Sequence, residues 1–141
     1  SNYCKACLRC IEQVAKVKPH VNQVQLHAGM KGPDPGGLVS YTLAMGAKIQ
    51  AYRPLAQGRV IKSQIVHEIA NAHGKSAAQV GLKWVLQQGH TAITTTENVD
   101  HMRGNLDVFD WELSEGELAR LSDMEPPDGW LDNIVGELCV L

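Results

Sequence analysis

The 141-residue chain has no long hydrophobic run and no excess of one charge. No stretch approaches the ~20 consecutive apolar residues that span a bilayer, and the first residues lack the basic-then-apolar order of a signal peptide. Its 13 basic and 15 acidic residues are mixed along the chain, without the basic patch that nucleic acid or an anionic membrane requires. These absences predict no membrane span and no nucleic-acid partner.

Cysteine is also scarce, with four residues in the chain. Four are too few for a disulfide scaffold, so we expect an intracellular, reducing compartment. Cys4, Cys7 and Cys10 form a CxxCxxC run, but a zinc or iron–sulfur site needs four converging ligands, and Cys139 is far away in sequence. We therefore predict no metal site, and expect these cysteines to lie on a helix at the edge of its apolar face.

The 44% hydrophobic content is enough for one buried core, and the apolar spacing alternates between helical and strand-like segments. Capping-box patterns at Ser76 with Gln79 and at Ser114 with Glu117 mark two helix starts. We predict helices over 4–16, 38–45, 63–73, 76–88, 98–106 and 114–124, and strands over 21–28, 48–55 and 91–96.

Strands that alternate with helices predict an α/β fold with parallel strands and a ligand site at their carboxyl ends. Three strands cannot close a barrel. We expect residues 1–125 to form one unit and residues 126–141 to form an extended C-terminal tail.

Five segments, in order along nearly the whole chain, resemble the aldo-keto reductases: SNY at 1–3, VNQVQLH at 21–27, AYRPL at 51–55, KSAAQVGLKWVLQQG at 75–89 and NLDVFDWELSEGELARL at 105–121. The resemblance covers the C-terminal half of that family's (β/α)8 barrel. It implies half of a TIM-type barrel, with strands 6 to 8 in residues 1–125, that begins inside a segment the family usually continues upstream.

The resemblance also implies binding of NADP(H) and reduction of a small aldehyde or ketone. Ser1, Asn2 and Gln23 match residues that bind the nicotinamide carboxamide, and Tyr52 matches the aromatic residue that stacks on the nicotinamide ring. Leu55 matches a backbone N–H donor to the pyrophosphate, and Asn105 matches an adenine contact.

Three positions depart from the family pattern. Thr95 and His101 stand where the family has the lysine and the arginine that hold the cofactor's 2′-phosphate, and Gly104 replaces a carboxylate that grips the adenosine. Each charge-assisted contact is worth roughly 1.5–3 kcal/mol, so the loss of two predicts at least a hundredfold weaker binding of NADP(H).

The family's catalytic tyrosine, lysine, aspartate and histidine belong to the first half of the barrel, so we predict no catalytic residue in this chain. We expect the chain to be the C-terminal half of such an oxidoreductase, inactive without a first half or a protein partner that covers the open barrel. The alternative is a catalytically dead subunit that serves a structural role in a larger assembly.

Other polar residues suggest no further chemistry. His67 and His73 are six positions apart, whereas a metalloprotease helix needs HExxH. His27 is expected to be a hydrogen-bonded structural residue. The acidic pairs Asp110 with Glu112 and Glu115 with Glu117 flank a helix start, where they complement the helix dipole. The tryptophans are expected to serve packing, although Trp130 could instead contact a partner.

Overall fold

The computed structural model describes residues 1–125, so the expected tail at 126–141, with Trp130 and Cys139, lies outside the described residues. Nine helices and strands follow one another in that range: α1 (Lys5–Val14), β1 (Val21–Gln25), α2 (Leu38–Ala44), β2 (Lys48–Tyr52), α3 (Gln64–His73), α4 (Ala77–Gln87), β3 (Thr91–Ile93), α5 (Val99–Leu106) and α6 (Glu115–Asp123). The same range contains three short 3-10 turns: η1 (Pro35–Gly37), η2 (Ala56–Gly58) and η3 (Val60–Lys62). No helix in this range is long and apolar enough to cross a membrane.

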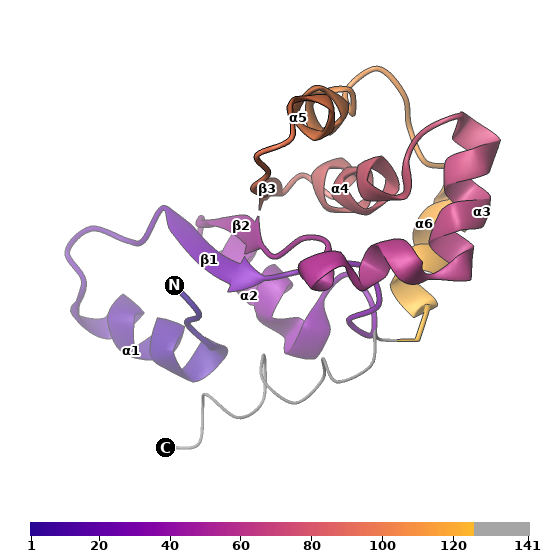
Figure 1. Ribbon diagram of the computed structural model, residues 1–141. Helices are drawn as coiled ribbons and strands as arrows, with labels where there is room; N and C mark the ends of the chain where they lie inside the picture. Colours follow the sequence, from indigo (N-terminus) through magenta and orange to yellow (C-terminus); the bar gives the residue numbers. More distant parts are fainter. Residues whose placement is uncertain (126–141) are drawn as a thin grey trace.

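The three strands form one parallel sheet in the order β1-β2-β3 (Figure 1). Gln23 pairs with Gln50, and Gln50 pairs with Thr91. Because parallel strands with helical crossovers run in one direction, their carboxyl ends meet at one edge. The expected α/β architecture, three parallel strands with outer helices from a TIM-type barrel, is confirmed.

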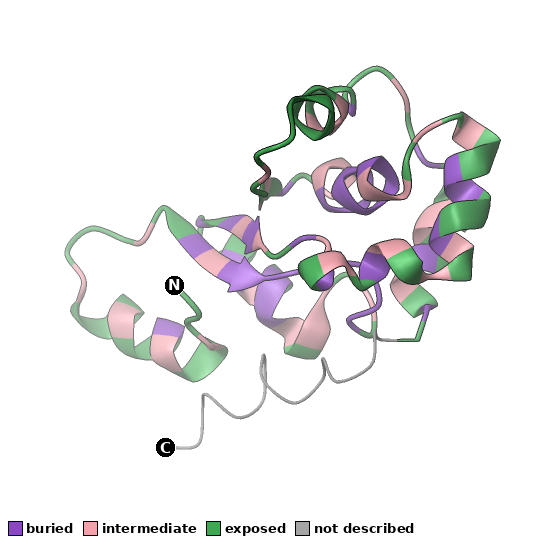
Figure 2. Cartoon of the chain, viewed as in Figure 1, coloured by how far each residue is buried: buried purple, intermediate pink, exposed green. Residues whose placement is uncertain are grey.

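Along β2 and most of β1, buried residues alternate with exposed or half-buried ones (Figure 2), so one face of the sheet is buried and the other is largely open. Val24 and Ala51, paired neighbours on one face, are 5% and 0% exposed. On the opposite face, Val21 is 48% exposed and Ile93 is 41% exposed. In a closed barrel this second face points inward, so the alternation marks the strands as a wall of an incomplete barrel.

The core lies between the sheet and its helices rather than on the open face. Trp84 of α4 is fully buried, and its indole N–H donates to the Ser122 hydroxyl at 3.1 Å. The apolar cluster around it includes Leu26 and Ile49 from the sheet side, and Leu121 from α6. This core holds α3, α4 and α6 together at one end of the sheet (Figure 1).

Both predicted capping boxes are present. At α6 the Ser114 hydroxyl accepts from the Glu117 N–H at 3.3 Å, and the Glu117 carboxylate accepts from the Ser114 N–H at 2.8 Å. The same reciprocal pair, Ser76 with Gln79, begins α4. Helix starts were therefore predicted to within one or two residues.

The predicted strands were too long at their carboxyl ends. The sheet ends at Gln25, Tyr52 and Ile93 rather than at residues 28, 55 and 96. After β2 the chain turns at once, since Arg53, Ala56 and Gln57 all have positive φ. The residues beyond β2 and β3 contribute to the loops that line the candidate site, and they are not paired as strands.

Replacing the α6 cap, Ser114→Ala, is expected to lower the free energy of unfolding by about 1 kcal/mol, because the Glu117 N–H loses its acceptor. Urea denaturation followed by circular dichroism measures this change. Ser40→Ala is the control, since that exposed hydroxyl donates to the carbonyl of Gly37, just before α2, and caps no N–H group. Equal losses in the two variants would contradict the capping role.

Candidate functional site

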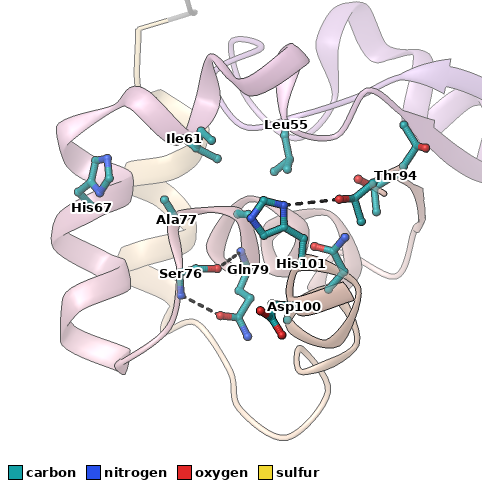
Figure 3. A pocket seen from close by; sticks show the side chains of 14 residues that line it. Leu55, Ile61, His67, Ser76, Ala77, Gln79, Thr94, Asp100 and His101 are labelled. Atoms are coloured by element: carbon teal, nitrogen blue, oxygen red, sulfur yellow. Dashed lines mark hydrogen bonds between the residues drawn. The ribbon is translucent and has the colours of Figure 1, made fainter. Parts of the chain in front are cut away.

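A pocket of about 550 Å³ lies beyond the carboxyl ends of β2 and β3 (Figure 3). Three parts of the chain form its walls: the segment after β2 with Leu55 and Ile61, the start of α4 around Ser76, and residues 94–105 after β3. Its size falls in the usual range of small-molecule sites. Its position is the one that parallel β/α folds use for ligands.

Leu55 lines the pocket from a tight turn after β2. Its carbonyl accepts from the N–H groups of Gly58 at 2.9 Å and Val60 at 3.3 Å. Gly81 of α4 allows this close approach, because a Cβ there would lie 2.6 Å from Leu55 Cδ2. The Leu55 turn therefore packs directly on the helix that forms the pocket floor.

The wall after β3 is ordered by side chains that bond to the backbone. The Asn98 side chain caps α5 by accepting from the N–H groups of Asp100 at 2.8 Å and His101 at 3.2 Å. Thr96 Oγ1 accepts from the Asn98 N–H at 3.1 Å and lies 3.5 Å from His101 Nδ1. These bonds hold the His101 side chain toward the pocket, as Figure 3 shows.

The structure brings together five of the nine sequence-derived positions. Leu55, Thr95, His101, Gly104 and Asn105 all line the pocket. They come from two loops and one helix that are separated by up to 50 residues in sequence. This group matches the pyrophosphate and adenosine end of the cofactor site that the resemblance implies.

The remaining four positions lie apart from that pocket. The Asn2 N–H donates to the Gln23 carbonyl at 2.7 Å, so the first residues run along the free edge of β1. Gln23 Nε2 donates to Gln50 Oε1 at 2.8 Å on the open face, and the strand register places Tyr52 on that same face. Ser1 lines a separate small pocket beside α1, with Leu8 and Pro19.

Several pocket residues were not predicted, among them Ile61, His67, Ser76 and Asp100. Ser76 was recognised only as a helix cap, and His67 only as part of a failed metal motif. The signal that could have found them is positional, because the first turns of helices that follow parallel strands surround the strand ends. Asp100 is such a residue, two positions into α5.

No group of three or more histidine, cysteine or acidic side chains within residues 1–125 could hold a metal ion. Cys7 and Cys10 are free thiols at the half-buried and exposed positions of α1. His73 contacts protein groups instead. Its Nε2 lies 2.9 Å from Glu117 Oε1, and its ring lies 5.0 Å from the Trp111 ring. Partial burial raises the pKa of Glu117, but hydrogen bonds from Ser114 and His73 outweigh it and hold that pKa below its usual value.

His27 is buried, with 1% exposure, just beyond β1. Its Nδ1 lies 2.8 Å from the Ala28 carbonyl and its Nε2 lies 3.2 Å from Gln25 Nε2. A neutral ring that donates from Nδ1 and accepts at Nε2 satisfies both contacts. Burial lowers the pKa of His27 despite the Ala28 contact, so this histidine is a neutral structural residue below the strand end.

Parallel β/α units with a pocket beyond the strand ends are typical of TIM-type barrels, and this chain forms part of such a barrel. The chain belongs to the aldo/keto reductase family, whose model matches residues 1–125.

Known relatives are about twice as long as this chain or longer. It is 35% identical to D-galacturonate reductase of Fragaria ananassa, with 92% of this chain matched to 42% of that protein. It is also 35% identical to glyoxal reductase of Bacillus subtilis, with 76% of this chain matched to 38% of that protein. The chain therefore spans less than half the length of these curated relatives.

Solved structures agree. An aldose reductase from Schistosoma japonicum superposes with a TM-score of 0.78 at 30% identity, over 86% of this chain and 38% of that one. A variant of Gox0644 in complex with NADPH superposes with a TM-score of 0.80 at 30% identity, over 91% and 46% of the two chains.

Acidification is expected to destabilise the fold through His27. Because burial lowers its folded-state pKa below the ordinary 6.5, the unfolded chain binds the proton more tightly. The free energy of unfolding should be constant well above pH 6.5, and should fall as the pH drops from 6.5 toward the lower folded-state pKa. Urea denaturation across this range measures the slope of the unfolding free energy against pH. In His27→Gln that slope should be shallower by the equivalent of at most one bound proton. The control His20→Gln, at an exposed position, should keep the slope of the unchanged chain. An unchanged slope in His27→Gln would contradict this assignment.

Proposed function

We propose that this chain is the cofactor-binding half of an oxidoreductase that reduces small aldehydes or ketones with a nicotinamide dinucleotide. Catalysis then requires a first half of the barrel, carried by the same polypeptide or by a separate chain. The cofactor supplies the hydride, and the residues of this chain bind and orient it.

The observation that carries this proposal is the convergence of Leu55 and Asn105 on one pocket beyond β2 and β3. Leu55 presents backbone in a tight turn, which suits a pyrophosphate because backbone N–H groups need no side-chain charge. Asn105 on α5 offers an amide that can both donate to and accept from an adenine edge. One dinucleotide in this pocket could contact both groups, which supports the proposal.

The nicotinamide end would lie on the open face of the sheet. Gln23 and Tyr52 occupy that face on neighbouring strands, and Asn2 is fixed beside Gln23 by a 2.7 Å backbone hydrogen bond. An aromatic ring at a strand end can cover one face of the nicotinamide and leave the other for hydride transfer. We assign Asn2, Gln23 and Tyr52 to this end, and Ser1 with them only through the resemblance, because Ser1 lines the small pocket beside α1.

Exposed apolar side chains at both edges of the sheet support a partner, or a first half of the barrel, that covers them. Val14, Val17 and Val21 are exposed on the β1 side, with fractions of 80%, 73% and 48%. Ile93 and several apolar residues around α5 are exposed on the β3 side. In a barrel both regions contact the strands and helices of the first half, whose burial of these groups would stabilise the assembly.

The alternative is a catalytically dead, structural subunit. It is favoured by the absence of lysine and arginine from the described pocket lining, where Thr95 and His101 stand instead. The two functions differ in one measurable property, because a structural subunit has no need to bind a dinucleotide.

Titration of the chain with NADH and with NADPH, followed by calorimetry, tests the proposal. We expect measurable binding of at least one cofactor, no oxidation of either with a simple aldehyde by this chain alone, and turnover once a first half is supplied. Asn105→Ala should weaken binding about five- to tenfold, as the loss of one hydrogen bond predicts.

Asn71→Ala on the exposed face of α3 is the matched control, and its affinity should equal that of the unchanged chain. Failure of both cofactors to bind would sink the proposal and leave the structural role.

A further inference from the structure

The pocket that receives Leu55 and Asn105 lacks a fixed positive charge. Of the described residues that line it, none is lysine or arginine, and Asp100 is the one carboxylate. Two imidazoles, of His67 and His101, are the remaining ionisable groups of this lining. A 2′-phosphate placed beside Asp100 would meet one negative group and no permanent cation among the described lining residues.

The nearest arginine along α5 is directed at that carboxylate. Arg103 Nη1 lies 3.2 Å from Asp100 Oδ1, one helical turn away, and both side chains are highly exposed. An exposed pair of this kind contributes little to stability. It nevertheless shows that the geometry of α5 aims Arg103 at its own helix partner rather than at the pocket.

The lining instead suits hydroxyl groups. Thr94, Thr95 and Thr96 line the pocket in succession beyond β3. A threonine hydroxyl can donate and accept, and that of Thr96 already accepts from the Asn98 N–H. The Asp100 carboxylate can only accept, which makes it a partner for a ribose hydroxyl and a repulsive neighbour for a phosphate. A carboxylate beside a ribose accepts from its hydroxyls and repels a 2′-phosphate, as the acidic residue of Rossmann sites does in a different fold.

We infer that this pocket selects a dinucleotide whose adenosine ribose carries free hydroxyls, NAD(H), over the 2′-phosphorylated NADP(H). The inference rests on the proposed function, since it names which cofactor the same site takes. Thr95, His101 and Asp100 are the residues that determine the preference.

Two fragments test this with the unchanged chain: 5′-AMP and adenosine 2′,5′-bisphosphate, which differ only in the 2′-phosphate. At about pH 8, above the ordinary titration range of histidine, calorimetric titration should show 5′-AMP binding on the order of tenfold more tightly. Equal or tighter binding of the bisphosphate would overturn the inference.

A double variant, Thr95→Lys with His101→Arg, should reverse the preference. Two charge-assisted contacts to the 2′-phosphate are expected to raise the affinity ratio of bisphosphate to 5′-AMP by about a hundredfold. Val99→Lys is the control, because Val99 begins α5 next to Asp100 but does not line the pocket. A similar reversal in Val99→Lys would show that net charge alone, rather than these positions, sets the ratio, and would overturn the assignment.

Asp100→Asn supplies a third arm with little change of shape. It removes the carboxylate and releases Arg103, so the preference for 5′-AMP should fall severalfold. An unchanged ratio would remove Asp100 from the set of determinants and contradict the inference as stated. Circular dichroism spectra of all variants confirm that the fold is retained.

The same titrations separate the two proposals. If NADPH and the bisphosphate bind more tightly than NADH and 5′-AMP, the proposed function stands and the inference on NAD(H) fails. If none of the four ligands binds, both fail.

Discussion

The in-register parallel pairing of three strands is the constraint on which the rest of the structure depends. Because Gln50 pairs with both Gln23 and Thr91, the carboxyl ends of β1, β2 and β3 lie along one edge. The loops that leave those ends must therefore meet. A shift of one residue would turn the buried face outward, and so the apolar pattern of each strand fixes the register and with it the place of the pocket.

The sequence predicted the helices well because their signals are local. Two capping-box patterns mark helix starts in the sequence, Ser76 with Gln79 and Ser114 with Glu117. The structure contains both reciprocal pairs. Strand ends are set by tertiary pairing, so the β-branched residues Thr94 to Thr96 gave a strand prediction where the structure has a loop. The resemblance supplied candidate positions, but only the structure separates those that share the pocket, such as Leu55 and Asn105, from those on the open face. Asp100 escaped prediction because nothing in its local sequence distinguishes it from an ordinary helix-start residue.

Membership of the aldo/keto reductase family and the charge of the pocket point to different conclusions about the cofactor. Family membership is carried by the fold and by an ordered set of segments over residues 1–125. Cofactor choice is carried by two or three side chains, because a phosphate dianion is bound by cations rather than by a fold. If the proposed function holds, Thr95 and His101 in place of lysine and arginine would change the ligand without any change in the strands and helices that present it.

The hydrogen bond between Gln23 and Gln50 on the open face bears on how such a barrel is assembled. One hydrogen bond joins these amides across the strands of the open face, while the Trp84 core on the other side is closed. The side of the sheet that carries the core and the side that would face the lumen of a barrel are thus held by different kinds of interaction.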